Sequence, residues 1–176
     1  MELWDAYYPD ATKAGVDLIR GQPVPPQYRH AVTEILVVHR DGTILLTQRD
    51  FQKPIYPGSW EASAGGAVIK GESFLSGAIR ELQEETGIRC TALEPLYRNV
   101  TADTIYQGYL CVTDAEKDSI RLQEGETVAY RWVGLSEFWA VLQSGLCLSN
   151  SRGQLDKVLA RLGWYAQLHS SPDAQS

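Results

Sequence analysis

The chain has 176 residues, a formal net charge of -6 and three cysteines. This length is expected to give one compact domain with a sizeable core. The acidic balance, with no block of Lys or Arg, excludes a general affinity for nucleic-acid backbones or anionic membranes. No apolar run approaches the length of a membrane span, and the first residues do not form a signal peptide, so a cytoplasmic protein is expected.

The first elements in the chain predict a β-hairpin over residues 2–20. The segments ELWDAYY and VDLIR are separated by PDATKAG, which is rich in turn-forming residues. The Pro-rich GQPVPPQ then leads into the strand AVTEILVV, and Asp41 and Gly42 form a tight turn into a second strand, TILLTQR. The hairpin is expected either to add a small sheet or to contribute to a subunit contact. In the second case the protein would form a homodimer.

The second half of the chain predicts further strands and two helices. CTALEPLYR, TIYQGYLCVT and YRWVGL have strand-like composition, helices are expected at about 135–143 and 151–166, and the closing HSSPDAQS is expected to be disordered. The strands alternate with only a few helices and show no regular strand-helix repeat. This pattern is typical of an α/β sandwich with a mixed sheet between helices. The cysteines lack metal-type spacing and are expected to be free, buried thiols: Cys90, Cys111 and Cys147.

A glycine-rich turn before residue 73 leads into a predicted helix over Ser73–Thr86, which Gly87 ends in a left-handed conformation. Apolar residues at helical spacing form a stripe expected to face the core: Leu75, Ala78, Ile79 and Leu82. At 100° per residue, Glu81, Glu84 and Glu85 gather on one flank of this stripe, and Arg80 is expected on the other side.

This carboxylate cluster opposes the helix's own preferences. Like charges three and four residues apart each cost about 0.2 to 0.5 kcal/mol. The negative end of the helix dipole disfavours each anion by roughly 0.3 to 1 kcal/mol. A divalent cation bound by carboxylate oxygens would neutralise the cluster, and such hard ligands favour Mg²⁺, Mn²⁺ or Ca²⁺.

The whole segment from Gly66 to Ile88, GAVIKGESFLSGAIRELQEETGI, resembles a complete Nudix box. The resemblance implies an α/β/α sandwich and a hydrolase that uses Mg²⁺ or Mn²⁺ to cleave a nucleoside diphosphate linked to another group. It assigns the metal to Glu81, Glu84 and Glu85, with a backbone carbonyl of Gly65 or Gly66. Arg80 would orient Glu81 and take part in catalysis, while Glu72 would brace the loop and Gly87 would end the helix.

Residues outside the box extend the resemblance. The run ILLTQRDFQKPIYPGSWEASAGGAV is similar to the branch containing isopentenyl diphosphate isomerases, in which an Arg and a Lys four residues apart bind a diphosphate. Arg49 and Lys53 match that pair and are the expected substrate-binding residues. The general base stays open among Glu81, Glu124 and Glu126, with Glu126 preferred because it lies six residues before Trp132.

Two alternatives to hydrolysis remain open. The isomerase requires a cysteine and a histidine where this chain has Gly65 and Ala67, so an isomerase-like enzyme is the weaker hypothesis. The second alternative is a non-catalytic nucleotide sensor. Nudix proteins with such a role have commonly lost the box glutamates, whereas this chain keeps them. The expected organisation is an extension and linker over residues 1–28, a Nudix hydrolase domain over 29–168 and a tail over 169–176. The expected partner is a small-molecule diphosphate, without nucleic acid or membrane.

Overall fold

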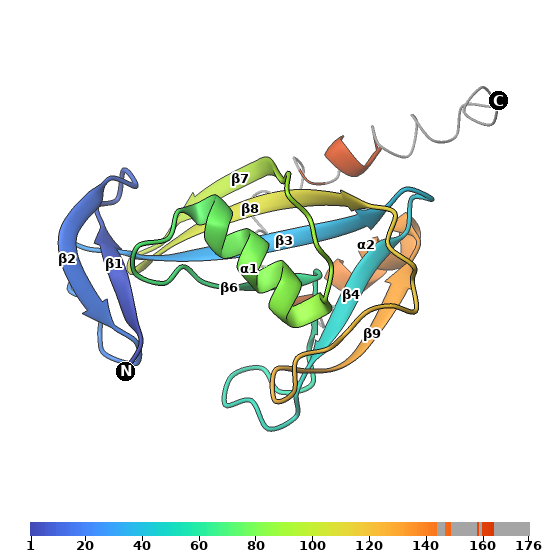
Figure 1. The fold of residues 1–176 in the computed structure, drawn as a ribbon, viewed down its shortest axis with the longest axis horizontal. Coiled ribbons are helices and arrows are strands. Elements are labelled where there is room, and N and C mark those ends of the chain that lie inside the picture. Colours follow the sequence, from blue (N-terminus) through green and yellow to red (C-terminus); the bar gives the residue numbers. More distant parts are fainter. Residues whose placement is uncertain (144–146, 149–157, 159, 164–176) are drawn as a thin grey trace.

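The computed structural model describes residues 1–143, 147–148, 158 and 160–163 (Figure 1). Its strands are β1 (Leu3–Tyr7), β2 (Lys13–Ile19), β3 (His30–His39), β4 (Ile44–Arg49), β5 (Trp60–Glu61), β6 (Ala64–Ala67), β7 (Glu94–Val100), β8 (Thr104–Thr113), β9 (Thr127–Val133) and β10 (Cys147–Leu148). Its helices are α1 (Phe74–Thr86) and α2 (Leu135–Gln143). The predicted hairpin is confirmed, because β1 and β2 pair antiparallel in a sheet of their own.

The main sheet is mixed, and its order is β10-β5-β4-β3-β8-β7. The parallel pair β3 and β8 runs from His30 opposite Thr104 to His39 opposite Thr113. On its other edge β3 has two antiparallel partners in succession, since β6 pairs with its first half and β4 only near its end. β9 pairs with β4. The glycine-containing strand β6 is thereby held against the middle of the sheet, directly before the loop that leads to α1.

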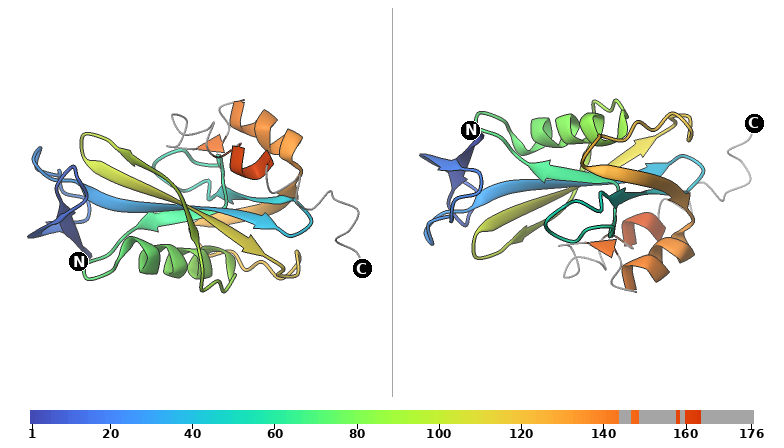
Figure 2. Two further views of the ribbon diagram at one scale, coloured as in Figure 1. Left: turned by 90° about the horizontal axis from the view of Figure 1, so that it is seen from above. Right: turned by 90° about the horizontal axis from the view of Figure 1, so that it is seen from below.

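Helices cover both faces of this sheet (Figure 2), which confirms the predicted sandwich. On one face α1 packs through Ala78 and Leu82 onto Ile35, Val37 and Leu45. On the other face, α2 contributes the side chains of Phe138 and Leu142 to a second core, which also contains Leu36, Val38, Ile44, Leu46, Val133, Val158 and Leu162. Alternate residues of β3 and β4 face opposite cores, as expected for strands buried on both sides.

Local sequence explains the bounds of α1. Ser73 caps the helix by accepting the Ser76 backbone N–H at 3.0 Å, and Gly87 ends it at φ 74° while donating its N–H to the Gln83 carbonyl at 2.9 Å. The predicted stripe is wrong at Leu75, which is exposed. Helical side chains tilt toward the N-terminus, so a residue of the first turn can reach past the sheet into solvent.

Other expectations need correction or lie outside the described part. The short strands β5, β6 and β10 were not predicted, and β7 begins at Glu94 rather than near Cys90. Of the helix expected at 151–166, residues 158 and 160–163 are helical and the rest lies outside the described residues, as does the tail at 169–176. Cys90 and Cys111 are free thiols, as expected, but only Cys111 is buried, since Cys90 is partly exposed. Among the described helices, none combines the length and hydropathy that crossing a membrane requires.

Candidate functional site

The candidate site lies where the glycines of β6 face the last two turns of α1. Gly65 donates its backbone N–H to Glu85 Oε2 at 2.9 Å, and the Glu85 side chain is buried. Burial raises the pKa of Glu85 to about 8 despite this hydrogen bond, and the nearby carboxylates of Glu81, Glu61 and Glu126 raise it further. Glu85 is therefore an anion that the folded protein by itself disfavours.

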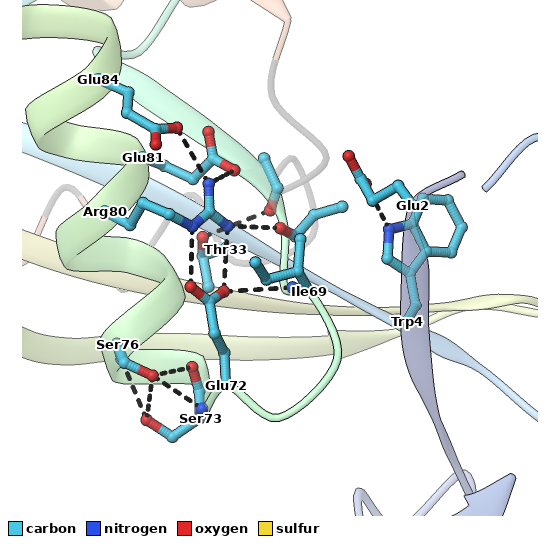
Figure 3. Close-up of polar contacts among 12 residues, drawn as sticks. Glu2, Trp4, Thr33, Ile69, Glu72, Ser73, Ser76, Arg80, Glu81 and Glu84 are labelled. Atoms are coloured by element: carbon cyan, nitrogen blue, oxygen red, sulfur yellow. Dashed lines mark hydrogen bonds and ion pairs between the residues drawn. The ribbon is translucent and has the colours of Figure 1, made fainter. Parts of the chain in front are cut away.

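Arg80 joins Glu72, Glu81 and Glu84 into one network (Figure 3). Its guanidinium contacts both carboxylate oxygens of Glu72, from Nε at 2.8 Å and from Nη2 at 3.0 Å. Nη1 contacts Glu81 at 2.7 Å and Glu84 at 3.1 Å, and Nη2 donates to the Ala67 carbonyl at 3.0 Å. The expectation that Arg80 turns away from the glutamates is wrong, because Arg80 and Glu84 are four residues apart and therefore neighbours on one face of the helix.

Glu72 connects this network to the loop before the helix. One of its oxygens accepts the Ile69 backbone N–H at 3.2 Å while both bind Arg80. Burial opposes the ionised form, but the hydrogen bonds from Arg80 and from Ile69 lower the pKa of Glu72 below its usual value. The loop and helix are thus tied by a charge-assisted bidentate pair, the strongest kind of side-chain contact available here.

The three predicted metal ligands differ in their surroundings. Glu85 is buried and 13% of the Glu81 side chain is exposed, whereas 46% of the Glu84 side chain is exposed. Burial raises the pKa of Glu81, although Arg80 counteracts it. Within the described residues, no three His, Cys, Asp or Glu side chains are arranged to hold a metal ion.

The donor set nevertheless suits a hard divalent cation. It consists of carboxylate and carbonyl oxygens, the ligands that Mg²⁺ and Mn²⁺ prefer. A Cβ atom at Gly66 would lie 2.5 Å from Glu81 Oε1, so the glycine leaves room for that carboxylate. A cation beside Glu81 and Glu85 would compensate the negative charge of these two carboxylates, which are largely shielded from water.

Both predicted phosphate-binding cations are paired with carboxylates near Glu85. Arg49 Nη1 contacts Glu61 Oε1 at 2.6 Å, and Arg49 Nε donates to the Ile55 carbonyl at 3.2 Å. Lys53 Nζ forms an ion pair with Glu126 Oε2. The structure therefore brings the preferred late glutamate, Glu126, next to a substrate-binding candidate. Glu124, the other candidate base of that loop, is exposed.

Glu61 is a site residue that the sequence did not reveal. It lies on β5, where a two-residue strand places it opposite Thr47 and its side chain beside Arg49. Its charge also acts on Glu85. A single glutamate after a tryptophan carries no spacing signal, and only the pairing of β5 with β4 brings it into the site. The pairs Arg49–Glu61 and Lys53–Glu126 thus lie close enough to Glu85 for both of their carboxylates to act on its charge.

The chain is similar in sequence to proteins of one known family. A family model described as NUDIX domain matches residues 28–148. An uncharacterised Nudix hydrolase of Listeria monocytogenes is 29% identical over 147 residues, which cover 82% of this chain and 87% of that protein. An isopentenyl-diphosphate Delta-isomerase of Salmonella typhi is 30% identical over 122 residues, covering 65% of this chain and 66% of the isomerase.

Solved structures share the fold. The protein DR0079 of Deinococcus radiodurans superposes with a TM-score of 0.72 at 20% identity, covering 92% of this chain and 99% of that one. The NUDIX domain of Shewanella oneidensis NrtR, solved with ADP-ribose, gives a TM-score of 0.58 at 20% identity, covering 76% and 88% of the two chains. At these identities the likeness establishes the fold alone.

Proposed function

Because the chain belongs to the NUDIX family and is a hydrolase of diphosphate linkages, we propose that it is a metal-dependent cytoplasmic enzyme acting on a small-molecule diphosphate such as a nucleoside diphosphate linked to another group. The observation that supports metal dependence is the burial of the Glu85 carboxylate. This carboxylate is buried beside Glu81, and the two lack a compensating cation other than Arg80 among the described residues. A divalent cation removes that imbalance.

Glu81, Glu84 and Glu85 would hold Mg²⁺ or Mn²⁺, together with the carbonyl of Gly65 or Gly66. When bound, such a cation neutralises phosphate oxygens and lowers the pKa of a coordinated water. Arg80 contributes by fixing Glu81, because its guanidinium is itself fixed by both oxygens of Glu72. The chain thereby orients its ligands before substrate arrives.

Arg49 and Lys53 would bind the diphosphate by exchanging partners. Each is paired with a carboxylate, Arg49 with Glu61 and Lys53 with Glu126, and phosphate oxygens can replace those carboxylates. Release of Glu126 from Lys53 leaves a carboxylate free to accept the proton of the attacking water. Substrate binding and activation of the base are coupled in this arrangement, since the same lysine contacts both groups.

The reaction class is tested with purified protein and a panel of nucleoside diphosphate derivatives, including ADP-ribose, and isoprenoid diphosphates, in the presence of Mg²⁺ or Mn²⁺. The ADP-ribose bound by the Shewanella NUDIX domain makes that compound a reasonable first member. We expect metal-dependent release of phosphate-containing products from at least one compound. No turnover at high enzyme concentration would contradict hydrolysis, and tight nucleotide binding without turnover would favour a sensor.

The isomerase alternative has the Arg49 and Lys53 pair in its favour, and backbone geometry against it. A Cβ atom at Gly65 would lie 2.5 Å from the Thr33 carbonyl oxygen, so the position matching the isomerase cysteine has no room for a side chain unless the strands move. Isomerisation would incorporate deuterium from D₂O into isopentenyl diphosphate without releasing phosphate. We expect no incorporation.

A further inference from the structure

The amino-terminal hairpin contacts the box through the loop over residues 69–72. Leu3 accepts the Lys70 backbone N–H at 2.9 Å, which adds a main-chain hydrogen bond between β1 and this loop. Asp5 Oδ2 accepts the Gly71 N–H at 3.0 Å, and Lys13 Nζ donates to the Glu72 carbonyl at 3.2 Å. Three successive loop residues are therefore held by the two strands of the hairpin.

The charges of the hairpin are compensated partly by this loop. Asp5 lies directly opposite Asp17 in the antiparallel pair, so two carboxylates share one face of the small sheet. Like charges in such a position destabilise a hairpin. Lys13 contacts Asp5 at 2.5 Å, and Lys70 of the loop contacts Asp17 at 2.6 Å. The hairpin thus neutralises Asp5 by its own Lys13 but depends on the loop for the partner of Asp17.

The apolar side of the hairpin reinforces the contact. Trp4 stacks on His30 at 4.6 Å between ring centroids, and the Tyr7 ring lies 5.3 Å from Phe74 in the first turn of α1. Trp4 belongs to a small apolar cluster with Ala6 and Leu18. This cluster also packs against Ala67, whose carbonyl accepts a hydrogen bond from Arg80. The hairpin thus touches residues on both sides of the loop, before it and after it.

We propose that this hairpin is a positioning element of the catalytic site, with Asp5 and Lys13 as its positioning residues. They fix the backbone of Gly71 and Glu72, Glu72 fixes Arg80, and Arg80 fixes Glu81. The inference rests on the proposed metal-dependent function, since its consequence is that metal ligands lose their orientation when the hairpin contact is cut. Neither Asp5 nor Lys13 is itself expected to touch metal or substrate.

The test compares Asp5→Ala with the matched control Asp17→Ala in the full chain. Both remove one carboxylate from the same face of the hairpin, but only Asp5 bonds the loop backbone. In metal-free protein, the Gly71 amide of Asp5→Ala should exchange with deuterium about fivefold faster, the factor equivalent to one hydrogen bond. Its Mn²⁺ dissociation constant should rise about tenfold, the lower end of the effect of outer partners of metal ligands.

The kinetic signature separates positioning from general damage. Asp5→Ala should lower kcat and leave the KM of the diphosphate nearly unchanged, because Arg49 and Lys53 do not contact the hairpin. Asp5→Asn, which keeps an acceptor for the Gly71 N–H, should restore slow exchange at Gly71. Equal Gly71 exchange and equal Mn²⁺ affinity in wild type, Asp5→Ala and Asp17→Ala would overturn the proposal, as would equal losses in both alanine variants, which would indicate charge alone.

Failure of the proposed function gives a different result. If the wild type neither binds Mn²⁺ nor turns over substrate, the metal-dependent function is wrong, while exchange at Gly71 still decides whether the hairpin holds the loop. If Asp5→Ala does not fold, Lys13→Met replaces it, with the Glu72 amide as the reporter. This variant removes the contact with the Glu72 carbonyl and the ion pair with Asp5, and it keeps the Asp5 carboxylate that accepts the Gly71 N–H.

Discussion

The carboxylate of Glu81 occupies the space that a side chain at Gly66 would need: a Cβ atom there would lie 2.5 Å from Glu81 Oε1. The atoms in the way belong to the end of a flexible side chain, so a methyl group would displace the carboxylate rather than the backbone. Gly66 thus leaves the space in which the carboxylate of Glu81, a predicted metal ligand, lies.

Gly66→Ala is therefore expected to lower kcat/KM by about tenfold or more, the effect of misplacing a metal ligand, with little change in the thermal midpoint. Gly134→Ala is the matched control, because a Cβ atom at Gly134 would meet nothing within 4 Å. Steady-state kinetics and thermal melts of the two variants check this. Equal activity of Gly66→Ala and wild type would mean that Glu81 need not occupy its present position.

Glu85→Gln is expected to stabilise the metal-free protein and to remove its response to metal. The glutamine can still accept the Gly65 N–H but carries no charge. A pKa of about 8 marks the ionised carboxylate as costly. The gain near neutral pH should be on the order of 1 to 3 kcal/mol, since one pKa unit corresponds to about 1.4 kcal/mol. Thermal melts with and without Mg²⁺ or Mn²⁺ measure both effects.

The control for this variant is Glu84→Gln, whose exposed carboxylate should change metal-free stability little. Wild-type protein should melt at a higher temperature with millimolar Mg²⁺ or Mn²⁺, because a ligand of the folded state stabilises it. Both glutamine variants should lose hydrolysis. A wild-type melt that metal leaves unchanged would contradict the predicted metal site.

Glu126→Gln is expected to lower kcat by about 10²-fold or more with a small effect on KM, as for loss of a general base. Glu124→Gln in the same loop is the control and should retain activity, because Glu124 is exposed. Lys53→Met should instead raise KM, since it removes a phosphate contact. If the Glu126→Gln enzyme has a normal kcat, Glu126 is not the general base and Glu81 is the remaining candidate.

Asp41 gives a prediction about stability and pH away from the site. Burial opposes its charge, but hydrogen bonds from Lys117 and Thr43 hold its pKa well below the usual value. A depressed folded-state pKa contributes stability above the unfolded-state value, and this contribution disappears as pH falls through the folded-state value. Asp41→Asn should therefore lose about 1 kcal/mol at pH 6 and progressively less toward pH 3. Urea unfolding at both pH values measures the difference.

Much of this fold follows from local sequence. The bounds of α1 could be predicted because Ser73 and Gly87 cap it, and the hairpin because turn residues separate two apolar segments. Strands β5 and β6 could not, since they are short and β6 is mostly Gly and Ala, which leaves no alternation to detect. Their partners in β3 and β4 specify them.

The site divides in the same way. The spacing of Glu81, Glu84 and Glu85 indicates a cation, but the direction of Arg80 depends on the carboxylates and carbonyl around it. Glu61 enters only through strand pairing, and the contact of Asp5 with Gly71 joins residues far apart in the chain. Tertiary contacts of this kind have no signature in a single sequence.

The parallel pairing of β3 with β8 has a consequence for how the protein is made. His30 and Thr104, which meet at one end of that pair, are 74 residues apart, and the whole box lies between them. Such distant pairing delays folding, because a long loop must close before its contacts can stabilise anything. On the ribosome, the hairpin and the box loop both emerge before β8. The loop can then supply Lys70 to Asp17 and stabilise the hairpin before β3 pairs with β8.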